Sequence, residues 1–302
     1  TWLIRLLYTY SSMASRFFIL FPFLALFSGF TSAGLEDGDM QLEQSGCGLQ
    51  EPFMFWLWSG MAGSPNAERL SGLRNVEDIA FETKDNRLLR GYRLKAAGGE
   101  GQVTSPKGYL LVMQGNAILA DQIIEEFTPF SSAGLDVYVY DFRGYGRSGG
   151  KRRLKAIVSD YVEILAALDS PEYEQHFVYA MSFGGVAFLD GFQSHARLDR
   201  IIVDSTPSRL SDYGCPSEYD PVNHLPQDCS HFLFIVGQSD RVVPPSMSQA
   251  LVETAQSRGA QLLRDEAFGH PFMDYDRSVH RRRMQAIEEY LLNKPGSDPN
   301  FR

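Results

Sequence analysis

The chain has few cysteines and no excess of basic residues, and both shortages exclude classes of function. Its 302 residues include three cysteines, Cys47, Cys215 and Cys229, and no Cys-x-x-Cys or Cys/His spacing that would indicate zinc. The net charge of −9 argues against a nucleic-acid partner, which would favour a basic face. The basic clusters KRRLK at Lys151 and RRR at Arg281 lie on predicted helices and are interpreted as solvated faces.

The sequence also lacks an apolar run of the length that a transmembrane helix needs, about 20 residues. The nearest candidate, FFILFPFLALFSGF at 17–30, follows Met13 and a short basic stretch and precedes small residues ending at Ala33. This pattern predicts a secretory signal over 13–33, with an uncleaved membrane anchor as the alternative. Residues 1–12 precede the first methionine and are interpreted as an artefact of where the reading frame was opened.

The cysteines are compatible with one disulfide, because export permits such bonds. Cys215 and Cys229 lie in one loop-like segment, so they are the candidate pair, and Cys47 is left over. The residues before Cys47 faintly resemble a lipoprotein box, but Gln44 is polar where an aliphatic residue is expected.

The order of sequence patterns predicts an α/β fold. Residues 34–75 form a linker and an aromatic segment, of which 53–58 either packs on the domain or contacts a membrane. A predicted antiparallel hairpin, VEDIAFET and RLLRGYRLKA, opens a catalytic domain at 76–302. From Tyr109 onward short apolar runs alternate with helical patterns, which predicts a mostly parallel, doubly wound sheet. Ligands of such sheets bind where the strands end.

One strand-to-helix turn carries a candidate nucleophile. The segment AMSFGG, with Ser182 at its centre, is close to the G-x-S-x-G nucleophile elbow. The sharp turn needs small residues two positions either side of the nucleophile. Gly184 meets that need, and Ala180 is the smallest replacement for the first glycine. The alternative is an ordinary serine in a glycine-rich turn.

Two later strands end in candidate partners for Ser182. Asp240 follows LFIVG and His270 follows QLLRDEAFG, so the chain order is Ser…Asp…His, as in α/β hydrolases. Without a catalytic role, Asp240 would cap its turn and His270 would be a plain loop residue. Asp204, after RIIV, is the alternative acid, and His280 is the nearest competing histidine.

Two loops remain to be assigned. The turn QGNA after YLLVM offers the backbone N–H of Asn116, which with that of Phe183 would form an oxyanion hole. The loop DFRGYGRSGG contains G-x-G-x-x-G, but it follows the second parallel strand and the next strand does not end in an acidic residue. We therefore reject a nicotinamide cofactor. A P-loop also fails, because Tyr145 and Arg152 stand where glycine and Ser/Thr are required.

These motifs resemble the α/β-hydrolase superfamily over about 76–292, most of all the branch with monoacylglycerol lipases and serine aminopeptidase-like hydrolases. QGNA, DFRGYGRSGG, AMSFGG, GQSDRVVPP and FGHPF carry the resemblance. Gln114 replaces the usual histidine and Ala180 the usual glycine, and neither change removes a reacting group. The resemblance implies a hydrolase with no cofactor and no metal, acting through Ser182, His270 and Asp240.

The expected activity is hydrolysis of small or lipid-like carboxylic esters through an acyl-enzyme. The insert at 207–230 is short and polar, so a large helical lid is not expected. The alternatives are a serine peptidase or amidase of the same fold and a non-catalytic binding protein, although all three triad candidates are present. The expected location is the periplasm or the exterior, with peripheral membrane contact or an uncleaved anchor as further alternatives.

Overall fold

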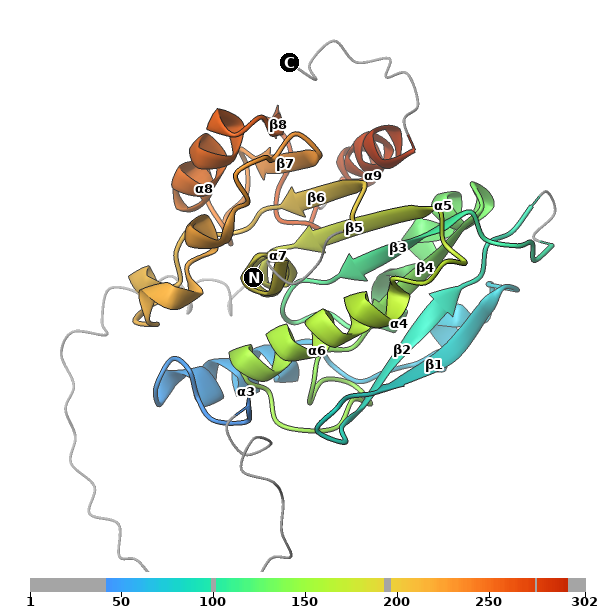
Figure 1. Cartoon of the computed structure of the whole chain (residues 1–302), viewed down its shortest axis with the longest axis horizontal. Helices are drawn as coiled ribbons and strands as arrows, with labels where there is room; N and C mark the ends of the chain where they lie inside the picture. Colours follow the sequence, from blue (N-terminus) through green and yellow to red (C-terminus); the bar gives the residue numbers. More distant parts are fainter. Residues whose placement is uncertain (1–41, 99–101, 193–196, 275, 293–302) are drawn as a thin grey trace, which may run out of the picture. The chain divides into compact units, whose positions relative to one another are not determined.

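The computed structural model describes residues 42–98, 102–192, 197–274 and 276–292 (Figure 1). The predicted signal over 13–33 and the stretch 1–12 lie outside the described residues. Among the described helices, none is long and apolar enough to cross a bilayer.

An eight-stranded sheet forms the centre of the described fold, in the order β1-β2-β4-β3-β5-β6-β7-β8. The strands are β1 (Val76–Glu82), β2 (Leu88–Leu94), β3 (Gly108–Met113), β4 (Leu135–Tyr140), β5 (Gln175–Met181), β6 (Arg200–Asp204), β7 (Phe232–Gly237) and β8 (Gln261–Asp265). The pairs β1–β2 and β2–β4 are antiparallel, and every later pair is parallel. The predicted hairpin and the mostly parallel sheet are therefore confirmed.

Helices cover both faces of the sheet (Figure 1). They are α3 (Gln50–Met61), α4 (Ala120–Ile123), α5 (Thr128–Ser132), α6 (Leu154–Leu168), α7 (Phe183–Gly191), α8 (Pro245–Ser257) and α9 (Arg277–Leu291), with 3-10 turns η1 (Ala67–Leu70) and η3 (Ile124–Phe127). Side chains of α6, α7 and α8 pack in one core cluster and those of α4, α5 and α9 in the other. Successive strand residues such as Leu110 and Leu111 enter opposite clusters, because side chains alternate along a strand.

The insert between β6 and β7 contains only 3-10 turns: η5 (Ser211–Tyr213), η6 (Ser217–Tyr219) and η7 (Pro221–His224). The expected absence of a large helical lid from this insert therefore agrees with the described structure. A different element, α3, lies beside the insert, where the Gln50 side-chain amide donates a hydrogen bond to the Tyr213 carbonyl (2.6 Å).

The predicted pairing of Cys215 with Cys229 is wrong. Cys215 is bonded to Cys47, with the two Cα atoms 4.3 Å apart, and Cys229 is a free, buried thiol. Cys229 lies just before β7, fully buried, with its sulfur 3.4 Å from the Pro226 carbonyl oxygen. Cys215 and Cys229 lie in one loop of the sequence but do not pair, because Cys229 is buried in the core next to β7.

The aromatic segment 53–58 lies on α3 and packs partly on the domain. The buried Glu51 carboxylate accepts hydrogen bonds from the backbone N–H groups of Cys47 and Leu154, both at 2.8 Å. Phe55 is buried, and its ring meets that of Phe183 edge-on, with centroids 5.2 Å apart. This contact brings α3 next to the residue that follows the candidate nucleophile.

Candidate active site

The three predicted triad residues follow three parallel strands at the carboxyl edge of the sheet. Ser182 comes directly after β5, Asp240 shortly after β7, and His270 in the loop after β8. In the sheet these strands lie in the order β5-β6-β7-β8, and their carboxyl ends point the same way (Figure 1). The fold thus places all three residues at the edge where α/β proteins bind ligands.

Ser182 occupies a strained turn at the start of α7. Its backbone has φ 53° and ψ −119°, a conformation that residues other than glycine rarely adopt. Gly184 packs against the neighbouring turn so closely that a Cβ would lie 2.1 Å from the Met113 carbonyl oxygen. The strain and the close packing are those expected of a nucleophile elbow.

Asp240 and His270 form a hydrogen-bonded pair. The Oδ2 atom of Asp240 lies 2.9 Å from Nδ1 of His270, and its Oδ1 accepts the backbone N–H groups of Val242 and Val243 at 2.8 and 2.9 Å. Burial alone would raise the pKa of Asp240, but the bond and charge of His270 and the two N–H groups outweigh burial and hold that pKa below its ordinary value. Asp240 is therefore a carboxylate fixed in orientation against His270.

The alternative acid and the competing histidine have other partners. Asp204, fully buried, accepts the Tyr179 hydroxyl at 3.0 Å and the Nη1 group of Arg283 at 2.8 and 2.9 Å. Arg283 also donates through Nη2 to the carbonyl of Gly269, the residue before His270. His280 lies 3.3 Å from the Glu126 carboxylate. Asp204 thus supports the histidine loop through Arg283 and does not contact the His270 ring.

The predicted oxyanion donors lie on both sides of Ser182. Phe183 is the first residue of α7, where an N–H has no acceptor within the helix. A Cβ on Gly115 would lie 3.4 Å from Cβ of Ser182, so the QGNA turn passes beside the candidate nucleophile. In the described part of the chain the Asn116 backbone N–H has no backbone acceptor. Two backbone donors are thus unengaged next to Ser182.

The loop DFRGYGRSGG supports the QGNA turn. The hydroxyl of Tyr145, which is buried in this loop, donates a hydrogen bond to Oδ1 of Asn116. Gly146 has φ 50°, and a Cβ there would lie 2.1 Å from the Asp141 carboxylate. The glycine pattern therefore serves backbone turns beside the candidate oxyanion hole.

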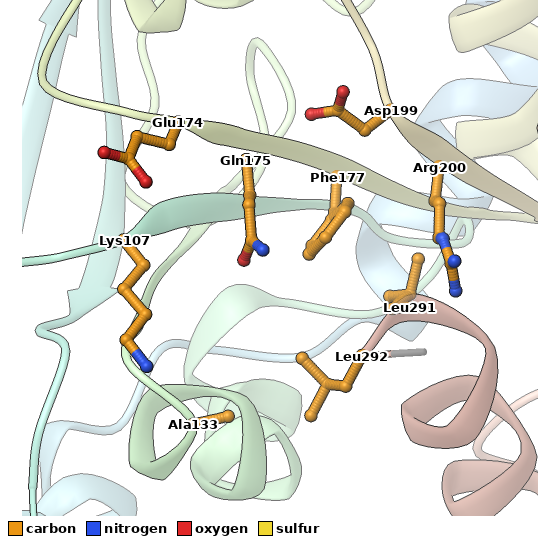
Figure 2. Close-up of a pocket in the computed structure, with 9 residues that line it drawn as sticks. All are labelled: Lys107, Ala133, Glu174, Gln175, Phe177, Asp199, Arg200, Leu291 and Leu292. Carbon is orange, nitrogen blue, oxygen red and sulfur yellow. The ribbon is translucent and has the colours of Figure 1, made fainter. Parts of the chain in front are cut away.

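Other features of the described residues lie outside this constellation. Ser182 and His270 share no hydrogen bond in the described structure, and none of its His, Cys, Asp and Glu clusters could hold a metal ion. A cavity of about 510 Å³ lies at the opposite, amino end of the sheet, between Lys107, Arg200 and Leu292 (Figure 2). No predicted site residue lines that cavity.

Three supporting residues were not predicted from the sequence. In the sequence Tyr145 stands out only as a mismatch to the P-loop, and Phe55 only as part of an aromatic run. Arg283 was assigned to a solvated basic cluster, but its side chain is buried and paired with Asp204. The one sequence signal for this pairing is Asp204, a carboxylate at the end of an apolar strand, because a carboxylate buried there needs a cation such as Arg283 beside it.

The comparisons with known proteins agree with this geometry. Residues 104–220 match the family model described as serine aminopeptidase, S33. An esterase of Pyrococcus furiosus superposes with a TM-score of 0.59 at 17% identity, covering 77% of this chain and 96% of that one. The chain has the α/β-hydrolase fold.

Curated α/β hydrolases are also similar in sequence. A monoacylglycerol lipase of Mycolicibacterium smegmatis is 35% identical over 94 residues, 29% of this chain. The match spans only 34% of the lipase. The alpha/beta hydrolase domain-containing protein 17B of Xenopus laevis is 27% identical over 231 residues, 72% of this chain and 78% of that protein.

Proposed function

We propose that this α/β hydrolase cleaves carboxylic esters through a Ser182–His270–Asp240 triad and an acyl-enzyme. The observation that carries the proposal is the Asp240–His270 pair, at 2.9 Å, on the same sheet edge as the strained turn at Ser182. The similarity to a monoacylglycerol lipase and to an esterase supports a small or lipid-like ester as substrate.

The proposed reaction transfers an acyl group to water. His270 accepts the hydroxyl proton of Ser182 as Oγ attacks the ester carbonyl carbon, and Asp240 stabilises the resulting imidazolium. The backbone N–H groups of Asn116 and Phe183 bind the oxyanion, and losing one such donor typically costs about 100–1000-fold in rate. The intermediate expels the alcohol, which takes the proton from His270. Water then attacks the acyl-enzyme by the same sequence and releases the carboxylic acid.

Labelling with a fluorophosphonate tests the nucleophile. We expect the wild-type chain to be labelled and Ser182→Ala to lose labelling completely, while Ser205→Ala, a matched change at the end of β6, stays labelled. Labelling that survives Ser182→Ala would assign the nucleophile elsewhere. A wild-type chain that is neither labelled nor active on p-nitrophenyl esters would favour a non-catalytic binding protein.

A peptidase or amidase is the second candidate, because the matched family model is described as a serine aminopeptidase. Paired substrates with one acyl group, a p-nitrophenyl ester and the corresponding anilide, separate the two. We expect the ester to be hydrolysed and the anilide to be at least about 100-fold slower, because p-nitrophenolate is a better leaving group than p-nitroaniline. Comparable rates would favour the amidase.

We also propose that the enzyme is exported, as the pattern over 13–33 predicts. Mass spectrometry of the mature protein tests this proposal. A new N-terminus near residue 34 would support a cleaved signal, and an intact segment would support an anchor.

A further inference from the structure

The helix α3 exposes an apolar side to solvent. Leu49, which precedes its first turn, is 96% exposed, and Phe53 and Trp56 are 59% and 63% exposed. Their spacing of four and three residues places them along one side of the helix. We call these three residues the α3 face.

The α3 face carries no charge. Between Leu49 and Ala67 the one charged residue is Glu51, which is buried and hydrogen-bonded to the domain. The outer side of a surface helix normally carries charged and polar residues. Exposed aromatic side chains along one uncharged side of a helix are instead typical of a surface that binds an apolar partner.

The α3 face is fixed relative to the candidate active site. The Cys47–Cys215 bond joins the start of α3 to the insert after β6. On its inner side, Phe55 packs on Phe183, whose N–H is a proposed oxyanion donor. A surface that binds through α3 is therefore held beside the site.

Further exposed apolar groups continue from α3 toward the loop of Asp240. Gln50 contacts Tyr213, which is 51% exposed and whose hydroxyl donates to the sulfur of Met247 at 3.1 Å. Val242, two residues after Asp240, is 50% exposed. Exposed apolar side chains thus also occur in the insert next to α3 and in the loop that carries Asp240.

The rest of the chain indicates what covers this face. The apolar run 17–30 ends eleven residues before the described part begins at 42, so in the sequence the segment suited to a bilayer lies close to α3. Aromatic side chains on one side of a helix suit the boundary between lipid headgroups and acyl chains. Residues 49–67 contain no Lys or Arg that would bind anionic headgroups, so the matching surface is electrically neutral.

We propose that the α3 face docks on the surface of a zwitterionic lipid bilayer and that the enzyme takes its esters from that surface. The second half rests on the proposed ester hydrolysis, whereas docking itself does not. The substrates would then be water-insoluble lipid esters whose scissile group lies near the headgroups.

Tryptophan fluorescence of the full chain with phosphatidylcholine vesicles tests the docking. Ser182→Ala serves as background so that lipid is not consumed. Subtracting the emission of Trp56→Phe from that of the background protein gives the emission of Trp56. The same subtraction with Trp58→Phe gives the emission of Trp58, a partly buried control beside Phe55. We expect vesicles to shift the Trp56 emission to the blue and to lower its quenching by iodide roughly threefold or more, with little change for Trp58.

A kinetic experiment tests delivery of the substrate. Phe53→Ser/Trp56→Ser should raise the apparent KM for a monoacylglycerol in vesicles about tenfold and leave kcat/KM for soluble p-nitrophenyl acetate unchanged. Val103→Ser, which removes a 58% exposed side chain elsewhere, should change neither.

Two outcomes would overturn the docking proposal. One is Trp56 emission that does not change with vesicles although the protein sediments with them, because another segment would then bind the membrane. Another is shielding of Trp56 that grows with protein concentration without lipid, which would assign the face to a second copy. An equal KM for the double variant and Val103→Ser on vesicle-borne ester would overturn the second half of the proposal, that the ester is taken from the bilayer surface. Loss of all ester hydrolysis with Trp56 still shielded would instead refute only the proposed function.

Discussion

Replacement of Asp240 by asparagine tests the triad most directly. In the structure Oδ1 of Asp240 accepts two backbone N–H groups, from Val242 and Val243, and Oδ2 faces Nδ1 of His270. An asparagine oxygen must keep the position facing the two donors, because an NH₂ group there would meet N–H groups. Its NH₂ group therefore faces His270 and donates to Nδ1.

This reversal leaves the proton of His270 on the wrong nitrogen. Nδ1 becomes an acceptor, Nε2 carries the proton, and the ring can no longer accept the Ser182 proton. The imidazolium also loses the facing carboxylate. In a triad with this geometry such a change lowers kcat by about 10⁴-fold, which corresponds to about 5 kcal/mol in the activation free energy.

The assay is kcat on a soluble p-nitrophenyl ester for wild type, Asp240→Asn and Asp204→Asn, with thermal unfolding of each. We expect Asp240→Asn to unfold near the wild-type temperature and to lose nearly all turnover. Asp204→Asn should mainly destabilise the fold, because it leaves buried Arg283 without a full counter-charge. A loss of less than about tenfold for Asp240→Asn would refute the assignment, and a stable, inactive Asp204→Asn would transfer the acid role to Asp204.

Three further predictions follow from close contacts around the site. Gly184→Ala should be inactive and destabilised by about 1–3 kcal/mol, the usual cost of overpacking, because its Cβ would meet backbone atoms. Gly185→Ala should be destabilised less, because its Cβ would meet only a threonine side chain. Equal unfolding temperatures for the two alanine variants would contradict this prediction. Tyr145→Phe should lower kcat roughly tenfold with KM little changed, because Asn116 loses the hydroxyl that holds its side chain; an unchanged kcat would remove the loop from the site. Burial raises the pKa of Asp141 to about 6, so its contribution to stability is fully present below the ordinary value and is lost as pH rises through about 6. Denaturant titrations from pH 4 to 7 should therefore show a smaller loss of stability with rising pH for Asp141→Asn, and parallel curves would show that Asp141 has no such shift.

The sequence predicted the sheet and the strand ends well, because buried parallel strands are short apolar runs that differ clearly from the helices between them. Ser182, Asp240 and His270 each followed such a run, so their common edge could be inferred without coordinates. Their catalytic roles stay predictions until the variants are measured.

What the sequence did not predict depends on contacts between distant segments. The helix α3 is apolar nearly all round, so its periodicity did not show which side faces the domain. Cys47 pairs across 168 residues, a distance at which spacing carries no information. Arg283 is buried while Arg281 and Arg282 beside it are exposed, because Arg283 pairs with the buried Asp204 and donates to the Gly269 carbonyl.

The bond between Cys47 and Cys215 bears on how the protein should be produced. The catalytic domain predicted from the sequence begins at residue 76, which invites expression of a shortened chain from that point. Such a chain would carry an unpaired thiol at Cys215. Its Phe183 ring would also lose the contact with Phe55, which would expose apolar surface beside the candidate nucleophile. Recombinant versions should therefore retain residues from 42 onward and be made in an oxidising host compartment.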